Sequence, residues 1–205
     1  MEILYLFFCP QLIKIRYTET INLVYFDNVI SISNIVLIRH LHSLLLPQRL
    51  ANISSLVLVW DLIRLSDGDD TPFGELEVYD NLMTRVSKTF PLVTKLYIWV
   101  DASPSIANPE YVDIGMYERR LLEPADALVQ RHGSRLKDFE LAPNLTLYTA
   151  LLRRAKKGGA RIEKRGTGLG SFHGFWRPAI TGCESPVADM AGYWVREGSD
   201  DTPLG

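Results

Sequence analysis

The stretch LLLPQRLANISSLVLVWDL, residues 44–62, decides the fold because it joins a short helix directly to a strongly apolar strand. Pro47 suits the first turn of a helix, where its missing N–H would have no partner, and the helix can continue to Asn52. Residues 56–60 are all apolar, and neighbouring strand residues point to opposite faces, so both faces must be covered. The stretch therefore predicts a central strand of a sheet.

The same pattern of helix and apolar strand recurs further along the chain. Residues 95–100, KLYIWV, are again apolar on both faces, and we expect this strand to lie beside residues 56–60 in parallel. Residues 136–141 alternate polar and apolar side chains, which predicts a strand near the edge of the sheet. Because helices separate these strands, the β-α-β-α-β order favours right-handed crossovers and a parallel sheet.

The helices between the strands have recognisable start and stop signals. Asp80 can cap a helix that follows a polar loop at residues 61–77. A second helix, at residues 116–132, should kink or restart just before Pro124. Asn144 can cap a third helix, which then leads to a pair of glycines.

These elements predict one α/β domain at residues 1–181, with irregular repeated strand–helix units around a mainly parallel central sheet. A leucine-rich-repeat-like arc is the alternative. Short strands are expected at residues 29–32 and, at the sheet edge, at residues 161–164. Residues 182–205 should form a mostly irregular C-terminal tail, in which residues 193–195 pack onto the core.

The run RYTETINLVYFDNVISISNIVLIRHLHSLLLPQRLANISSLVLVW, residues 16–60, resembles a large family of uncharacterised fungal proteins. That family is classed as a domain of unknown function and is often described as F-box-like, with a Leu-Leu-Pro-Gln-Arg-Leu helix that matches residues 45–50. The resemblance extends to GYWV at residues 192–195 and implies repeated strands and helices. Complete members should have a longer N-terminal region, with a helix that opens on Cys-Arg-Gln. Here the matching Cys9-Pro10-Gln11 stands close to the start, so the resemblance implies an N-terminal truncation.

Composition limits the class of protein. A chain of 205 residues with 47% hydrophobic content can bury a core without disulfides or a metal. Its two cysteines, Cys9 and Cys183, lie at opposite ends, which favours a reducing compartment and an intracellular protein, cytoplasmic or nuclear. The apolar start, MEILYLFFCPQLI, is too short to span a bilayer and lacks a signal-peptide pattern, so we expect no membrane attachment.

Candidate catalytic motifs fail on spacing or context. GTGLG at residues 166–170 lacks the G-x-G-x-x-G order that opens a helix in dinucleotide-binding folds. Ser171 and His173 lack the G-x-S-x-G elbow of hydrolases, and Cys183 lies near His173 only in sequence. We therefore expect no cofactor and predict that the protein is not an enzyme.

Metal-binding patterns fail in the same way. His40 and His42 are two residues apart on a predicted helix, so they point to different sides and cannot chelate one metal. A calcium loop that begins at Asp67 requires a glutamate at its twelfth position, where the chain has Val78. We expect no resident metal.

Two charged segments are candidates for partner binding. The acidic loop follows a central strand, at the edge where open α/β sheets bind ligands, and it should prefer a basic partner; its candidate residues are Asp67, Asp69 and Asp70. The basic run at residues 153–165 can bind phosphates, but a solvated helix end is the favoured interpretation because no nucleic-acid motif accompanies it. Its candidate residues are Arg153, Arg154, Lys156 and Lys157.

The leading functional hypothesis is a non-catalytic protein-interaction or scaffold domain of F-box-like or leucine-rich type, with an unknown protein partner. The alternatives are an enzyme with a dispersed site and weak nucleic-acid binding through residues 153–165. A net charge of −2 disfavours general nucleic-acid binding. A deep pocket that holds several titratable groups with perturbed pKa values would support the enzyme. The sequence does not define the oligomeric state.

Overall fold

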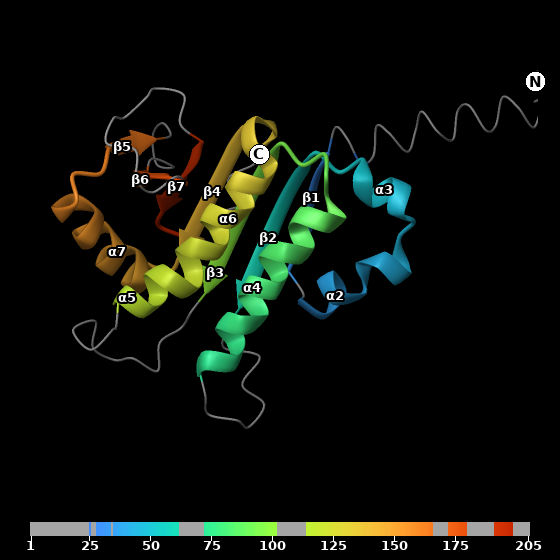
Figure 1. The fold of residues 1–205 in the computed structure, drawn as a ribbon, viewed down its shortest axis with the longest axis horizontal. Helices are drawn as coiled ribbons and strands as arrows, with labels where there is room; N and C mark the ends of the chain where they lie inside the picture. Colours follow the sequence, from blue (N-terminus) through green and yellow to red (C-terminus); the bar gives the residue numbers. More distant parts are fainter. Residues whose placement is uncertain are drawn as a thin grey trace, which may run out of the picture.

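A seven-stranded sheet with the order β1-β2-β3-β4-β7-β6-β5 forms the body of the protein (Figure 1). The computed structural model describes residues 25, 28–33, 35–61, 72–101, 114–165, 172–179 and 191–198. The strands are β1 (Val29–Ile32), β2 (Ser55–Asp61), β3 (Lys95–Asp101), β4 (Asp138–Pro143), β5 (Ile162–Arg165), β6 (Phe172–Pro178) and β7 (Gly192–Arg196). The helices are α2 (Ile35–Leu44), α3 (Pro47–Ala51), α4 (Pro72–Thr89), α5 (Ile114–Tyr117), a π-helical turn (Glu118–Leu122), α6 (Glu123–His132), a 3-10 turn (Gly133–Arg135) and α7 (Leu145–Lys157).

The first four strands form a parallel half-sheet. The register places Leu58 of β2 beside Ile98 of β3, and Ile98 beside Leu141 of β4. β2 and β3 are therefore adjacent and parallel, as the apolar runs predict, and the α/β class with a mainly parallel sheet is confirmed. Because Asp61 pairs with Asp101, these two strands also end at the same edge of the sheet.

β4 lies inside the sheet, so the prediction that this strand lies near the edge is wrong. Its alternating acidic residues suggested a solvated face, but Glu140 is only 9% exposed. The buried carboxylate is tolerated because Arg196 of β7 lies against it, with Nε 2.7 Å from Oε2 of Glu140. A buried ion pair thus gave the strand the sequence pattern of an edge.

The last two strands reverse the direction of the sheet. β7 pairs with β4 in parallel and with β6 antiparallel, and β6 pairs with β5 antiparallel. β5 is at the edge, which agrees with the strand predicted at residues 161–164. Residues 193–195 are buried, as predicted. They belong to an interior strand that pairs with β4 and β6, however, where the sequence predicted a mostly irregular tail. The sequence pattern did not predict β6 as a strand.

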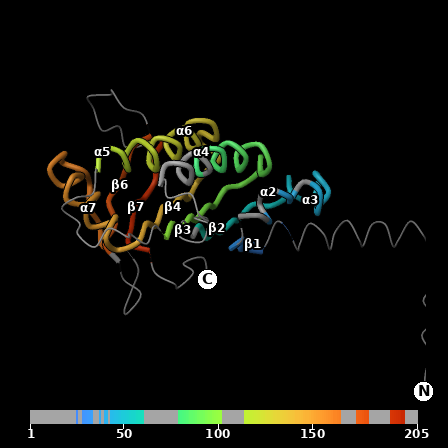
Figure 2. The backbone as a smooth tube through the Cα atoms, turned by 90° about the horizontal axis from the view of Figure 1, so that it is seen from below, coloured from blue at the N-terminus to red at the C-terminus, as the bar shows by residue number. Residues whose placement is uncertain are grey.

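The long helices α4 and α6 lie side by side over one face of the sheet (Figures 1 and 2). α7 packs on the same face, where Tyr148 stacks on Phe175 with ring centroids 6.4 Å apart. Asn144 caps α7 as predicted, since Oδ1 of Asn144 accepts a bond from the N–H of Leu147 at 3.1 Å. Within the described residues, no helix has both the length and the apolar character needed to cross a membrane.

Two helix starts refine the expectations from sequence. α4 begins at Pro72 rather than near Asp80, so part of the predicted polar loop is helical. Proline is favoured in the first turn of a helix, where the N–H has no partner in the helix. The helix predicted at residues 116–132 restarts at Glu123, directly before Pro124 as expected, and a π-helical turn precedes the restart.

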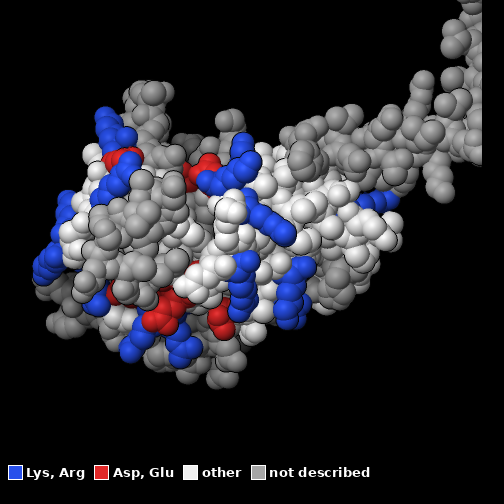
Figure 3. Space-filling model, turned by 45° about the horizontal axis from the view of Figure 1, so that its top comes forward, with Lys and Arg blue, Asp and Glu red and all other residues white. Residues whose placement is uncertain are grey.

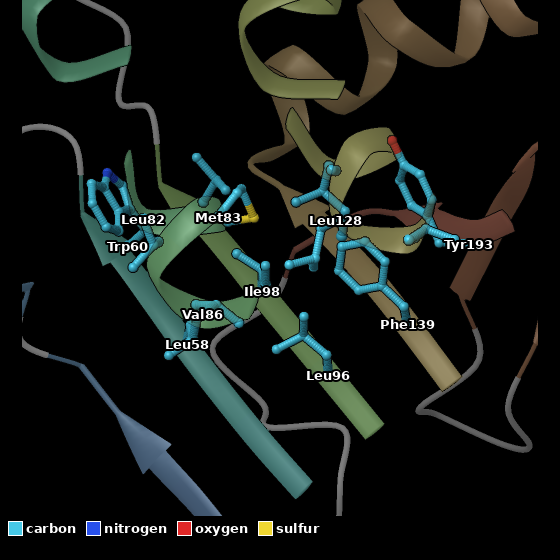
Figure 4. Packing of buried hydrophobic residues seen from close by; sticks show 14 of the residues in the cluster. Leu58, Trp60, Leu82, Met83, Val86, Leu96, Ile98, Leu128, Phe139 and Tyr193 are labelled. Atoms are coloured by element: carbon cyan, nitrogen blue, oxygen red, sulfur yellow. The ribbon is translucent and has the colours of Figure 1, made fainter. Parts of the chain in front are cut away.

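The main core lies between the helices and every second residue of the strands. Leu58, Leu96 and Ile98 point from β2 and β3 toward Val86 and other α4 side chains (Figure 4). These side chains are at most 1% exposed. Full burial of each stabilises the fold by roughly 1.5–3 kcal/mol relative to exposure.

The intervening strand residues face the other side of the sheet. Val57, Tyr97 and Ala142 form a second buried cluster, and Trp99 packs against it. The Arg196 guanidinium carbon lies 4.7 Å from the centroid of the Tyr97 ring, so the cation contacts both an aromatic face and a carboxylate.

Replacement of Gly192 by alanine tests the close packing of β7 against β6. A Cβ at this position would lie 2.5 Å from the carbonyl oxygen of Arg177 and 2.6 Å from the Trp176 ring. We expect Gly192→Ala to lower the free energy of unfolding by about 1–3 kcal/mol, measured by urea denaturation. Gly158→Ala is the matched control, because its nearest neighbour would be 3.5 Å away. Equal stability of the two variants would contradict the placement of β7.

Candidate interaction site

A buried ion pair joins α6 to β6 beneath the π-helical turn. Asp126 accepts three bonds from Arg177: Nε lies 3.0 Å from Oδ1 and 3.2 Å from Oδ2, and Nη2 lies 2.8 Å from Oδ2. The side chains of Asp126 and Arg177 are 10% and 17% exposed. Such a planar two-pronged contact fixes the orientation of both groups more tightly than a point charge would.

Tyr193 of β7 adds a third element to this pair. Its hydroxyl oxygen is 2.8 Å from Oδ1 of Asp126 and 3.2 Å from the carbonyl oxygen of Leu122. The Leu122 carbonyl belongs to the π-helical turn, where the usual helical bonding pattern is interrupted. The hydroxyl can donate its proton to one of these acceptors at a time, so the turn and the carboxylate share a single donor.

Glu118 extends the ionic contacts to the surface. Its Oε1 lies 3.2 Å from Nη1 of Arg177, and its Oε2 lies 2.6 Å from Nε of Arg154 on α7. Alternating cations and carboxylates therefore connect α7, the π-helical turn, β6 and α6. We call these residues the Arg177 cluster; its members are Glu118, Asp126, Arg154, Arg177 and Tyr193.

Two open pockets border the Arg177 cluster. The smaller, about 250 Å³, lies between α7 and β6 and has an apolar floor at Leu151 and Phe175. The larger, about 570 Å³, lies between the π-helical turn and the end of β6, and is lined by Arg119, Glu123 and Gln130 together with cluster residues. Both are surface hollows with mixed charges.

The electrostatics of the cluster favour ion pairing over proton transfer. Burial alone lowers the pKa of Arg177, but the bond to Asp126 and the surrounding negative groups outweigh burial, so the net pKa is raised. Burial raises the pKa of Tyr79 and of Tyr193 above 10.0, and the nearby Asp126 carboxylate adds to both shifts. Arg177 therefore stays charged and both phenols stay protonated near neutral pH. Among the described residues, no three His, Cys, Asp or Glu side chains form a group that could hold a metal ion.

The predicted basic residues lie at the end of α7 and are exposed. Arg154 belongs to the Arg177 cluster, whereas Arg153, Lys156 and Lys157 are exposed and form no ion pair with its described residues. Lysine and arginine side chains gather on this side of the molecule, at the left of Figure 3, where Figure 1 places α7 and β5. We call this region the basic surface; its residues are Arg153, Arg154, Lys156, Lys157, Arg161 and Lys164.

A second surface lies at the opposite end of the sheet. Four apolar side chains on β1, on α2 and at the N-cap of α3 are well exposed, and we call them the apolar edge: Val29 (41%), Leu37 (41%), Leu44 (61%) and Leu46 (58%). β1, α2 and α3 lie together at the right of Figure 1. The predicted acidic residues Asp67, Asp69 and Asp70 lie outside the described residues.

Sequence reasoning missed most of the Arg177 cluster. Asp126 and Arg177 are 51 residues apart, and Asp126 and Tyr193 are 67 apart, so no local spacing joins them. The one local signal was Pro124, which predicted a break in the helix that carries Glu118 and Asp126.

No protein-family model, curated protein or solved structure matches the chain.

Removal of the Asp126 charge tests how much the Arg177 cluster contributes to the stability of the fold. We expect Asp126→Asn to lower the free energy of unfolding by about 2–4 kcal/mol, because it leaves the Arg177 guanidinium largely buried with a weaker set of acceptors. Urea denaturation measures the loss. Glu123→Gln, an exposed change on the same helix, should stay within about 0.5 kcal/mol of the parent protein. A loss no greater than that of the control would show that the ion pair contributes little.

The buried phenols predict a specific pH dependence. The pKa values of Tyr79 and Tyr193 are raised in the folded protein, so the unfolded chain releases these protons first as the pH passes 10.0. We therefore expect the free energy of unfolding to fall progressively above pH 10.0, through the range in which the unfolded phenols are ionised and the folded ones are not. Urea denaturation at a series of pH values, with tyrosinate absorbance, measures this. Tyr193→Phe should reduce the slope; an unchanged slope would contradict the assignment.

Proposed function

We propose that this protein is a non-catalytic protein-interaction or scaffold domain. The observation that carries the proposal is the apolar edge, where Leu44 and Leu46 are 61% and 58% exposed at the junction between α2 and α3. Single exposed apolar residues are common on soluble proteins, whereas several on neighbouring elements are typical of surfaces that bind other proteins. The occupant that fits is a partner protein with an apolar surface of its own.

The architecture also supports a binding role for this end of the sheet. Within the described residues, β1 pairs only with β2, and it forms one end of the strand order. An end strand presents backbone donors and acceptors on its outer side, and β1, α2 and α3 lie at the same end of the sheet (Figure 1). Apolar contact and backbone bonding are therefore both available at this end of the sheet.

The Arg177 cluster supports a non-catalytic role. Both of its carboxylates accept from arginine side chains, so their oxygens are engaged in contacts within the protein. A general base requires a lone pair directed at a substrate proton, and a general acid requires a proton near neutral pH. The cluster has the pattern of a structural ion network that connects helices to strands.

Substitution of the two most exposed leucines tests the proposal. We expect the double variant Leu44→Ser, Leu46→Ser to weaken partner capture at least about tenfold, because each change removes a central apolar contact. Tagged full-length protein is incubated with an extract of the source organism, and the bound proteins are compared by quantitative mass spectrometry. The purified capture product is then titrated against each variant to give a Kd.

The matched control is the double variant Leu92→Ser, Leu145→Ser. These leucines are 45% and 57% exposed but lie outside the apolar edge, so the same chemical change should leave capture intact. Equal loss in the two double variants, or no loss in either, would remove the apolar edge as the binding surface. A saturable turnover by the purified protein would instead support the alternative of an enzyme.

A further inference from the structure

We infer that β5 and the adjoining end of α7 bind an extended acidic protein segment, which adds to the sheet as a further strand. The inference rests on the proposed function and names a second class of partner, bound at the opposite end of the sheet from the apolar edge. Its basis is the coincidence of a sheet edge, a surplus of cations and an exposed apolar side chain at β5.

The backbone of β5 offers bonding groups on its outer side. The N–H of Trp176 donates to the carbonyl of Arg161 at 2.8 Å, so residues 161 and 176 form a hydrogen-bonded antiparallel pair. Hydrogen-bonded and non-hydrogen-bonded pairs alternate along an antiparallel ladder. The backbone N–H and C=O groups of Ile162 and Lys164 therefore point away from β6. In the part of the chain that the structure describes, β5 pairs with β6 alone.

Side chains beside this edge give it a positive field. Arg154 and Arg161 are paired with Glu118 and Glu163 respectively. The other cations of the basic surface form no ion pair among the described residues; they are Arg153, Lys156, Lys157 and Lys164. Four uncompensated cations around a short edge strand favour a segment that carries several carboxylates.

The same lysines explain how the edge would discriminate between partners. Lysine on an edge strand opposes addition of ordinary strands, because pairing would bury or crowd its charge. A carboxylate opposite Lys164 converts that opposition into attraction, since directly opposite residues of paired strands share one face. Ile162 is 37% exposed, so an apolar residue in the segment would also gain contact there.

A protein segment fits this surface better than a nucleic acid does. Sequence-independent binding of single strands relies on aromatic side chains that stack on bases. The two tryptophans nearest the basic surface contact each other, with ring centroids 5.3 Å apart, and Trp194 is 8% exposed. The Arg161 guanidinium carbon lies 5.8 Å from the Trp194 ring centroid, which engages that ring further. These rings are therefore engaged within the protein.

The first test measures charge recognition with full-length protein. The probe is a fluorescein-labelled peptide of about eight residues in which Glu and Val alternate, long enough to span β5 at about 3.3 Å per residue. We expect anisotropy titration to show binding that weakens as salt rises, and weakens at least about tenfold in Lys156→Glu, Lys157→Glu. The control Lys88→Glu, Lys137→Glu makes the same charge change at exposed positions elsewhere and should bind as the parent does.

Two further probes distinguish an acidic protein segment from a nucleic acid as the ligand. A peptide in which Gln replaces Glu should not bind. Tighter binding of an oligothymidine of similar length, lost in the same lysine variant, would replace the inference with nucleic-acid binding. Equal binding by both lysine double variants would overturn it.

The second test isolates strand addition from charge. Lys164→Pro removes the outward N–H without removing a bond to β6, and proline is tolerated on an edge strand in that orientation. Lys164→Gln loses the same charge but keeps the N–H. We expect the proline variant to bind the Glu-Val peptide about fivefold more weakly than the glutamine variant, with unchanged thermal unfolding. Equal affinities would show that the segment binds by charge alone and would overturn strand addition.

The two proposals can fail separately. Failure of the peptide tests, with capture still lost in the Leu44 and Leu46 double variant, removes this inference and leaves the proposed function standing. If the peptide binds as expected but the Leu44 and Leu46 double variant captures partners normally, the apolar edge is ruled out as a binding surface instead.

Discussion

The junction between β4 and β7 holds the two halves of the sheet together. β1 to β4 form a parallel ladder, whereas β5 to β7 form an antiparallel ladder, and the halves meet where Leu141 pairs with Val195. Polar contacts lie on both faces of the sheet at this junction, and the pair of Glu140 and Arg196 joins β4 to β7 directly. On the helix face Asp126 binds Arg177 and Tyr193, and on the opposite face Glu140 binds Arg196. Without these contacts, apolar packing alone would have to align two ladders of different direction.

Buried ion pairs are a costly means of stabilisation, because each group loses its hydration. Their value at this junction is specificity of register. A shift of β7 by one residue would move Arg196 to the helix face and Tyr193 to the opposite face, since neighbouring strand residues alternate between faces. Arg196 would then lose its contact with Glu140, and the Tyr193 hydroxyl would lose its contact with Asp126. An apolar junction made of valine and leucine would tolerate that shift far better. The buried polar groups therefore specify the register of β7, although their burial costs free energy.

The strands that could be predicted from sequence are those with apolar side chains on both of their own faces. Both faces of β2 and β3 are buried, and each strand is a nearly continuous apolar run in the sequence. Their central, parallel pairing was therefore predictable from these runs. β4 and β7 obey the same geometry, but Glu140 and Arg196 interrupt their apolar pattern. In the sequence, each of these charged residues looks like a solvent-exposed residue, because its oppositely charged partner lies in a distant strand. The Arg177 cluster was missed for the same reason: it is assembled across 51 to 67 residues, and no spacing within one helix or strand encodes it.

The order of the strands also determines how the two proposed binding surfaces relate to each other. β1 and β5 are the first and last strands in the sheet, so six inter-strand steps separate them, or about 29 Å at about 4.8 Å per step. One end is apolar and the other is basic, and a partner suited to one is chemically poorly suited to the other. Because the seven strands form one continuous sheet, the strand order sets the distance between the two ends, and the Glu140–Arg196 pair opposes sliding of the parallel half past the antiparallel half. A small domain can then present two unlike surfaces at a constant separation, which is the physical requirement for a scaffold that holds two different partners at once.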